Sequence, residues 1–211
     1  LDATLSPAAF AVFDGTQVKL TVSATCRAEA PQLPPNALIS SVTIAQNSDS
    51  GTLMTLTVRP GEKLDGYYIE KTSGGLLLHV KRKPQAKDQS LPLKGLAIML
   101  DPGHGGTETG AIGPLGLRYA EKDINLNLAK KLAAELEALG ARVYLTREDD
   151  RTVSLEDRLA MSKMMLPDLF VSLHANSMAD NVDISKVDGF SVWYREPLAK
   201  DLVELLYNHV T

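Results

Sequence analysis

Two histidines stand directly after apolar runs that are typical of buried strands. His104 lies in the phrase DPGHGG, which follows the run 96–100, and His174 lies in SLHAN, which contains the end of the run 169–173. Ligands of parallel sheets bind at the carboxyl ends of the strands, so both side chains are expected at one edge of a sheet. Imidazole nitrogens are common zinc ligands, and two of them with one carboxylate make an established zinc set. The pattern therefore suggests a metal site.

Glu121 is the candidate for the carboxylate ligand, because it stands at the entrance to a predicted helix over 122–139. Three protein ligands leave a fourth zinc position for water, which is the arrangement of zinc hydrolases. A simpler interpretation exists for each residue. A histidine after a strand is more often an ordinary loop residue, and a glutamate is favoured at any helix N-terminus. The residues alone leave both interpretations open.

The elements that must position these residues alternate between strand and helix over residues 95–211. Strands are predicted at 96–100, 141–145, 169–173 and 190–194, and helices at 122–139, 155–165 and 198–210. This alternation predicts an α/β fold with a mainly parallel sheet flanked by helices.

Two of the predicted helices carry specific signals. The helix over 122–139 has an i, i+4 apolar stripe, with Ala129 and Ala133 beside it. The stripe consists of Ile124, Leu128, Leu132, Leu136 and Leu139. Ser154 and Asp157 resemble a capping box, which predicts that the next helix begins there.

Residues 1–83 have a different pattern. Alternating apolar and polar residues at 17–23, 42–44, 53–58 and 76–80 are separated by breaks rich in Ser, Asp, Asn, Pro and Gly. This pattern predicts a small all-β domain, an antiparallel sandwich, ahead of the α/β domain. Residues 84–94 are polar and contain prolines, so they are predicted to be a linker.

Composition excludes several classes of function. A net charge of −4 provides no general attraction for nucleic acid or acidic lipid. The apolar runs are far shorter than the roughly 20 residues that a membrane-spanning helix needs. The single cysteine, Cys26, excludes an internal disulfide.

Three arginines stand among acidic residues between 147 and 158. We expect Arg147, Arg151 and Arg158 to form a solvated, salt-bridged surface with these acids. Arg147 also follows a predicted strand, where its side chain could contact a substrate.

Four phrases then occur in a familiar order: LDPGHGG at 100–106, EKDINL at 121–126, LTR at 145–147 and SLHAN at 172–176. Together they closely resemble the zinc-dependent N-acetylmuramoyl-L-alanine amidases of the Amidase_3 family, which are bacterial cell-wall hydrolases. The resemblance covers about residues 95–211. It implies that zinc-activated water cleaves the amide between N-acetylmuramic acid and the L-alanine of the peptide stem.

The resemblance also implies roles for individual residues. The family's zinc ligands correspond to His104, Glu121 and His174, and we expect Asn176 and Arg147 to bind substrate. The family's general base is a late glutamate in a phrase like V-E-x-G-F-x-S-N, which does not occur in these 211 residues. The base is therefore expected beyond Thr211, and residues 1–211 alone are expected to bind zinc weakly or not at all and to turn over little substrate.

Two alternative functions keep the same fold. The first is a non-catalytic homologue that binds peptidoglycan or regulates its hydrolysis. The second is a zinc peptidase that acts on cell-wall peptides. The missing glutamate favours the first, and the intact ligand phrases favour an enzyme.

The first half more loosely resembles the AMIN domains that precede such catalytic domains, at residues 39–46 and 76–80. This resemblance implies that the domain targets the cell wall or division site, and a generic β spacer is an equal alternative. The expected partners are peptidoglycan and activator or septal proteins. The expected location is extracytoplasmic (cell wall, periplasm or secreted), which requires an export signal upstream of Leu1.

Overall fold

The computed structural model divides the chain into two compact units, Leu1–Lys83 and Pro84–Thr211. Each unit is described by itself. The structure describes residues 8–27, 29–47, 51–83, 88–113, 116–176, 189–194 and 197–210.

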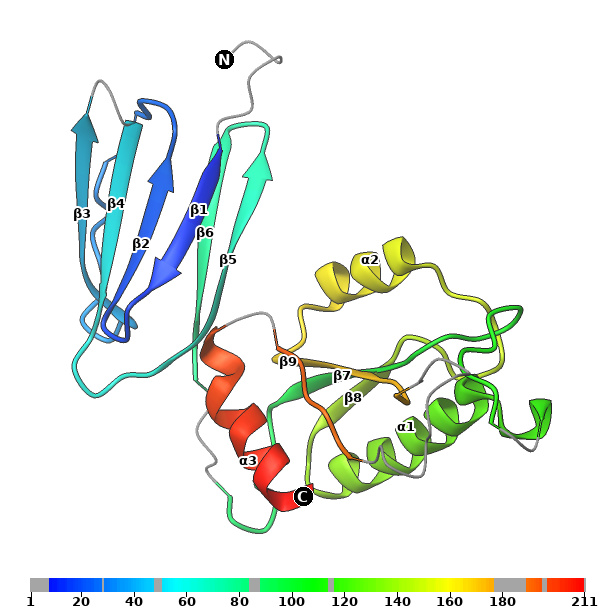
Figure 1. Cartoon of the computed structure of the whole chain (residues 1–211). Coiled ribbons are helices and arrows are strands. Elements are labelled where there is room, and N and C mark those ends of the chain that lie inside the picture. The colour runs from blue at the N-terminus through cyan, green and yellow to red at the C-terminus, as the bar shows by residue number, and fades with distance from the viewer. Residues whose placement is uncertain are drawn as a thin grey trace. The chain divides into compact units, whose positions relative to one another are not determined.

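The described strands of the first unit are all antiparallel, and it contains no described helix (Figure 1). Four strands form a sheet in the order β1-β2-β4-β3, and β5 and β6 form a separate hairpin. Their bounds are β1 Ala9–Phe13, β2 Gln17–Val22, β3 Ile39–Asn47, β4 Gly51–Val58, β5 Leu64–Thr72 and β6 Gly75–Arg82. The expected small all-β region is confirmed.

Alternation along β2 explains how this unit buries one face of its sheet. Val18, Leu20 and Val22 are buried, whereas Lys19 between them is exposed. The period of two is the property of a strand that places successive side chains on opposite faces. Strands β1 and β5 were not predicted. β1 is apolar throughout, and β5 contains Gly66, so neither has a clean alternation of apolar and polar residues.

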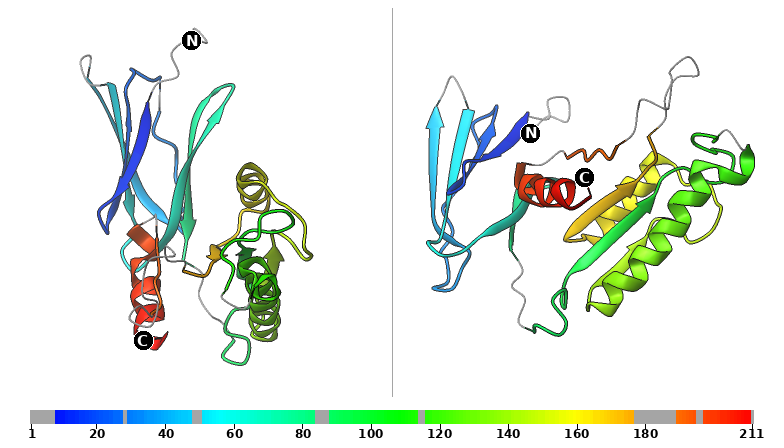
Figure 2. Two further views of the ribbon diagram at one scale, coloured as in Figure 1. Left: turned by 45° about the vertical axis from the view of Figure 1, so that its right-hand side comes forward. Right: turned by 60° about the horizontal axis from the view of Figure 1, so that its bottom comes forward.

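The second unit is built on a parallel sheet with the strand order β8-β7-β9. The strands are β7 Ala97–Pro102, β8 Arg142–Leu145 and β9 Leu169–Leu173. The helices are η1 Leu117–Tyr119, α1 Glu121–Ala138, α2 Leu155–Met165, η3 Pro197–Ala199 and α3 Lys200–Val210. Figures 1 and 2 show α1 along one face of this sheet and α2 on the other side. The α/β architecture with a mainly parallel sheet is thereby confirmed.

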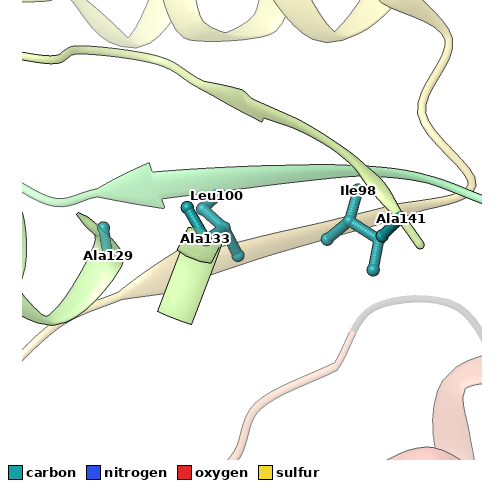
Figure 3. Close-up of a cluster of buried hydrophobic side chains, with 5 residues drawn as sticks. All are labelled: Ile98, Leu100, Ala129, Ala133 and Ala141. Carbon is teal, nitrogen blue, oxygen red and sulfur yellow. The ribbon is translucent and has the colours of Figure 1, made fainter. Parts of the chain in front are cut away.

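A small apolar core joins α1 to the sheet (Figure 3). It consists of Ile98, Leu100, Ala129, Ala133 and Ala141. Because side chains alternate along β7, the residues that follow Ile98 and Leu100 face the opposite side, toward α2. Asp101 is one of them, and it is only 5% exposed.

The apolar face of α1 differs from the predicted stripe. Ile124 and Leu128 are about half exposed, whereas Ala129 and Ala133 are buried against the sheet. The fully buried line is displaced around the helix and consists of Glu121, Asn125, Ala129 and Ala133. Small alanine side chains allow the helix to lie close to the sheet, where Ile98 and Leu100 fill the space above them. The larger Leu132 and Leu136 pack at the margin of the core.

One further expectation is corrected. Residues 190–194 form no strand in the described structure. A strand exists only through hydrogen bonds to a neighbouring strand, and a short apolar run in the sequence does not reveal whether such a neighbour is available. Within the predicted linker 84–94, residues 84–87 lie outside the described residues. Leu93 packs against the core of the second unit, and its backbone N–H donates to the Leu139 carbonyl at 3.0 Å.

No described helix is both long enough and apolar enough to cross a membrane.

Candidate metal centre

The carboxyl ends of β7 and β9 bring the two histidine phrases together. Pro102 of β7 pairs with Leu173 of β9, and the Gly103 N–H donates to the Leu173 carbonyl at 2.9 Å. His104 and His174 follow directly after these paired positions. Their imidazole rings lie edge to face, with centroids 4.9 Å apart and an interplanar angle of 80°.

Glu121, the first residue of α1, lies between the two imidazoles. Its Oε1 atom is 3.3 Å from His104 Nε2 and 3.1 Å from His174 Nδ1. One donor atom from each of the three residues can be chosen so that all lie within 4.8 Å of one another. Three residues that are distant in sequence therefore offer three ligand atoms to one point.

The backbone around Glu121 favours its ionised form. Burial opposes ionisation, but the backbone N–H groups of Ala111 and Ala175 and the side chain of Asn125 outweigh it, so the pKa of Glu121 is lowered. Ala111 donates to Oε2 at 2.9 Å, and Ala175 donates to Oε1 at 2.8 Å. His104 adds an electrostatic contribution in the same direction. A carboxylate with this pKa is ready to bind a cation without first losing a proton.

Two glycines, which have no side chain, lie where the cluster needs space. A Cβ atom at Gly103 would overlap the ring of His174. A Cβ atom at Gly110 would lie 2.6 Å from His104 Cδ2 and 2.7 Å from Glu121 Oε2. Any side chain at either position would therefore displace a member of the cluster.

The cluster is buried on one side and open on the other. The side chain of Glu121 is 4% exposed, that of His104 is 28% exposed and that of His174 is 52% exposed. Two imidazoles and an ionised carboxylate are a zinc donor set, and an open side is what a hydrolytic zinc site requires. The residues present thus fit a zinc ion.

Arg147, the first of the two residues expected to bind substrate, is buried beneath the cluster. The residue is only 2% exposed, and its guanidinium donates to four backbone carbonyl oxygens. The acceptors are Pro102 at 3.0 Å, Gly103 at 3.0 Å, Lys122 at 2.8 Å and Asp149 at 3.1 Å. Burial, followed by the charge of Arg158, lowers the pKa of Arg147. Arg147 therefore supports the backbone beneath the cluster, and the burial of its side chain argues against the expected contact with substrate.

The predicted solvated arginine surface is only partly present. Arg151 is exposed and pairs with Asp149 at 2.6 Å, as expected. Arg158 is instead 7% exposed and forms an ion pair with the buried Asp101. Thr146 and Ser172 also donate to this aspartate, at 2.6 and 2.7 Å.

Sequence reasoning missed Asp101 and Arg158 as parts of the site. A signal for Asp101 existed, because a charged residue ends a strand that is otherwise apolar. No comparable signal marked Arg158, which lies in a run of charged residues.

Asn176, the other expected substrate residue, is exposed two positions after His174. Its Oδ1 atom accepts a hydrogen bond from Ser191 Oγ at 3.2 Å. The amide therefore lies at the open end of β9, in contact with the segment 189–194.

Comparisons with known proteins cover the same part of the chain. A profile of the family Amidase_3, described as N-acetylmuramoyl-L-alanine amidase, matches residues 98–210. Over 122 residues the chain is 38% identical to the probable cell wall amidase LytH of Staphylococcus epidermidis, covering 56% of this chain and 39% of that relative. Over 80 residues it is 46% identical to the N-acetylmuramoyl-L-alanine amidase AmiC of Neisseria meningitidis, covering 38% of this chain and 19% of AmiC.

Among solved structures, the catalytic domain of the amidase CwlV from Bacillus (Paenibacillus) polymyxa var. colistinus is 29% identical. The match has a TM-score of 0.48 and covers 54% of this chain and 61% of that one. The chain spans well under half the length of the two curated relatives named above.

Proposed function

Because this chain belongs to the Amidase_3 family of N-acetylmuramoyl-L-alanine amidases, we propose that it acts as a zinc-dependent peptidoglycan hydrolase. The bond cleaved is the amide between N-acetylmuramic acid and the L-alanine of the stem peptide. One observation carries the proposal: within the region matched to the family, two histidines and a buried glutamate present their donor atoms within 4.8 Å of one another.

In this proposal His104, Glu121 and His174 hold the zinc ion. When bound, zinc supplies a Lewis acid for the amide carbonyl and lowers the pKa of water toward about 7. The backbone N–H groups of Ala111 and Ala175 keep the Glu121 carboxylate oriented and ionised between the two imidazoles. Asp101 and its partners lie under the loop that carries His104.

The open side of the cluster is the proposed approach for substrate. His174 is half exposed there, and Asn176 stands two residues further along the same strand end. We assign Asn176 to substrate binding, because its amide N–H₂ group can donate to a carbonyl of the stem peptide. Arg147 has no part in this contact, since it is buried.

The same proposal places the protein at the cell wall, outside the cytoplasm, where its substrate lies. Residues 1–83 are proposed as a β-domain that directs the enzyme to the wall or division site, and residues 95–211 as part of the catalytic domain. Activator or septal proteins remain proposed partners.

The test measures zinc binding and amide hydrolysis together. Zinc affinity of the 211-residue chain is measured by competition with a chromophoric chelator, and His104→Ala is the variant that removes a ligand. Release of stem peptide from purified peptidoglycan is measured with the 211-residue chain and with the complete gene product. We expect zinc binding that is lost in the variant, and zinc-dependent release by the complete product.

Other outcomes separate the alternatives. Zinc binding with no release by the complete product would favour a non-catalytic wall-binding or regulatory protein. Faster hydrolysis of free peptides than of muramyl peptides would favour a zinc peptidase.

A further inference from the structure

The loop that carries His104 is held by side chains from other parts of the second unit. Five consecutive carbonyl oxygens, those of residues 102–106, each accept a hydrogen bond from a side chain. The donors are Arg147, Arg158, Thr152 and Lys122. A buried carbonyl without a partner is costly, so the shape of the loop depends on these donors.

Arg158 makes the most direct contact with the ligand-bearing residue. Its NH2 group donates to the carbonyl of His104 at 2.9 Å, and its NH1 group donates to the carbonyl of Pro102 at 3.1 Å. Its Nε atom donates to the Val153 carbonyl at 3.0 Å. The guanidinium is a rigid planar fork, so these bonds fix the positions of the carbonyls relative to one another.

Asp101 connects Arg158 to the second histidine. It forms the buried ion pair with Arg158, and its Oδ2 atom accepts from Ser172 Oγ at 2.7 Å. Ser172 lies on β9, two residues before His174. One hydrogen-bonded network therefore extends from the carbonyl of His104 to the strand that carries His174.

The backbone conformation of His104 depends on these hydrogen bonds. Its φ angle is +63°, in the left-handed region that residues other than glycine rarely adopt. Such a conformation persists only where the surroundings enforce it. Residues that form hydrogen bonds to the ligands of a metal set the orientation of those ligands and thereby affect metal affinity.

We propose that Arg158 is a positioning residue of the metal centre. By joining the carbonyls of Pro102 and His104 to Asp101, it keeps His104 in the left-handed conformation that turns its imidazole toward Glu121. This inference rests on the proposed zinc site and extends it to a residue on α2.

Arg158→Lys tests the proposal. Lysine keeps a positive charge beside Asp101, but its single ammonium group cannot reproduce the fork that spans both carbonyls. We expect a folded protein with a weakened zinc affinity, by about 10- to 100-fold, which is the usual effect of losing a residue that orients a ligand. The visible spectrum of the Co²⁺-substituted protein should also change, because it reports ligand geometry rather than stability.

Arg151→Lys is the matched control on the same segment. Arg151 is exposed and pairs with Asp149, so the zinc affinity and the Co²⁺ spectrum of the Arg151→Lys variant should equal those of the wild type. Thermal unfolding of each metal-free variant, in EDTA, separates a loss of folding from a loss of positioning.

The outcomes distinguish this inference from the proposed function. A wild-type chain that binds no zinc contradicts the metal site itself, and this inference with it. A wild-type chain that binds zinc, with a folded Arg158→Lys variant of equal affinity, overturns only the positioning role. If Arg158→Lys does not fold, the Ser172→Ala variant is measured instead. Ser172 is exposed, so the substitution should not prevent folding, and it removes one hydrogen-bond donor to Asp101. Weaker zinc binding by that variant supports the proposal, and unchanged binding overturns it.

Discussion

Glu121 shows how a single residue can combine a structural and a chemical role. It begins α1, where a carboxylate is favoured by the helix N-terminus, and it also stands between two imidazoles. Two backbone N–H groups from separate loops hold its oxygens, which accounts for its lowered pKa in a buried position. The carboxylate is thus fixed in place before any ligand arrives.

Glu121→Gln is expected to weaken zinc binding by more than about 100-fold, above the range for residues that only support a ligand. Glutamine has no charge, and its amide group would oppose the N–H of Ala111 or Ala175. Chelator competition measures the affinity, and circular dichroism checks the fold. Glu137→Gln, on an exposed position of the same helix, is the control and should bind as the wild type does. Equal affinity of the two variants would contradict the role of Glu121 as a ligand.

Gly103→Ala tests the space beneath the cluster. An added Cβ would overlap the ring of His174, so this imidazole must move away from Glu121. We expect a loss of zinc affinity with little change in helix content. Gly113→Ala is the control, because its Cβ would meet nothing nearer than 3.7 Å. Tight zinc binding by Gly103→Ala would show that His174 is not held in this orientation when it binds metal.

The two arginines mark the limit of prediction for individual residues. Arg147 and Arg158 lie in the same charged stretch as Arg151, and nothing in the residue types separates them. The structure buries the first two because the carbonyls of residues 102–104 need donors from outside the loop. That need arises only once the loop has its tertiary shape.

At the scale of elements, local signals predicted the helices of the second unit well. Ser154 is the N-cap as predicted: its Oγ accepts from the Asp157 N–H at 3.1 Å, and α2 begins at the next residue. The Asp157 carboxylate accepts from the Ser154 hydroxyl at 2.8 Å. Strands β7, β8 and β9 lie within one or two residues of their predicted positions. Periodicity succeeded for these elements because each carries a short apolar run with clear breaks.

Ser154→Ala should lower the free energy of unfolding by about 1 kcal/mol, the usual effect of losing an N-cap side chain. Urea unfolding followed by circular dichroism measures this change. Ser162→Ala, within the same helix, should be neutral or slightly stabilising, because alanine is the better helix former. Equal stability of the Ser154→Ala variant and the wild type would show that the cap contributes nothing.

Prediction failed for elements whose form depends on contacts with other elements. Residues 190–194 are mostly apolar, as in a strand, but have no strand partner among the described residues. The buried face of α1 is displaced from the predicted leucine stripe toward Ala129 and Ala133, because these small side chains allow close approach to the sheet. In both cases the deciding quantity is packing against a neighbour.

At the scale of the whole molecule, the chain has a β unit and an α/β unit, and the metal cluster lies entirely within the second. A ligand that binds only the folded form stabilises that form. Zinc should therefore raise the free energy of unfolding of the second unit.

Zinc at about 100 times its dissociation constant should stabilise the second unit by about 2.7 kcal/mol. We expect its unfolding temperature to rise by several degrees, measured by scanning calorimetry, and to fall again when EDTA is added. His104→Ala should show no such rise. An equal rise in this variant would place zinc binding elsewhere.

The sequence by itself determined the family, the fold class and the three candidate ligands, because these depend on ordered motifs and short-range periodicity. The tertiary structure alone decided what surrounds those ligands: the displaced face of α1, the glycine space under the imidazoles, and the buried pair Asp101 and Arg158. These features arise from contacts between segments far apart in the chain. Local residue patterns do not encode which segments meet, so the support of the site could be read only from the folded molecule.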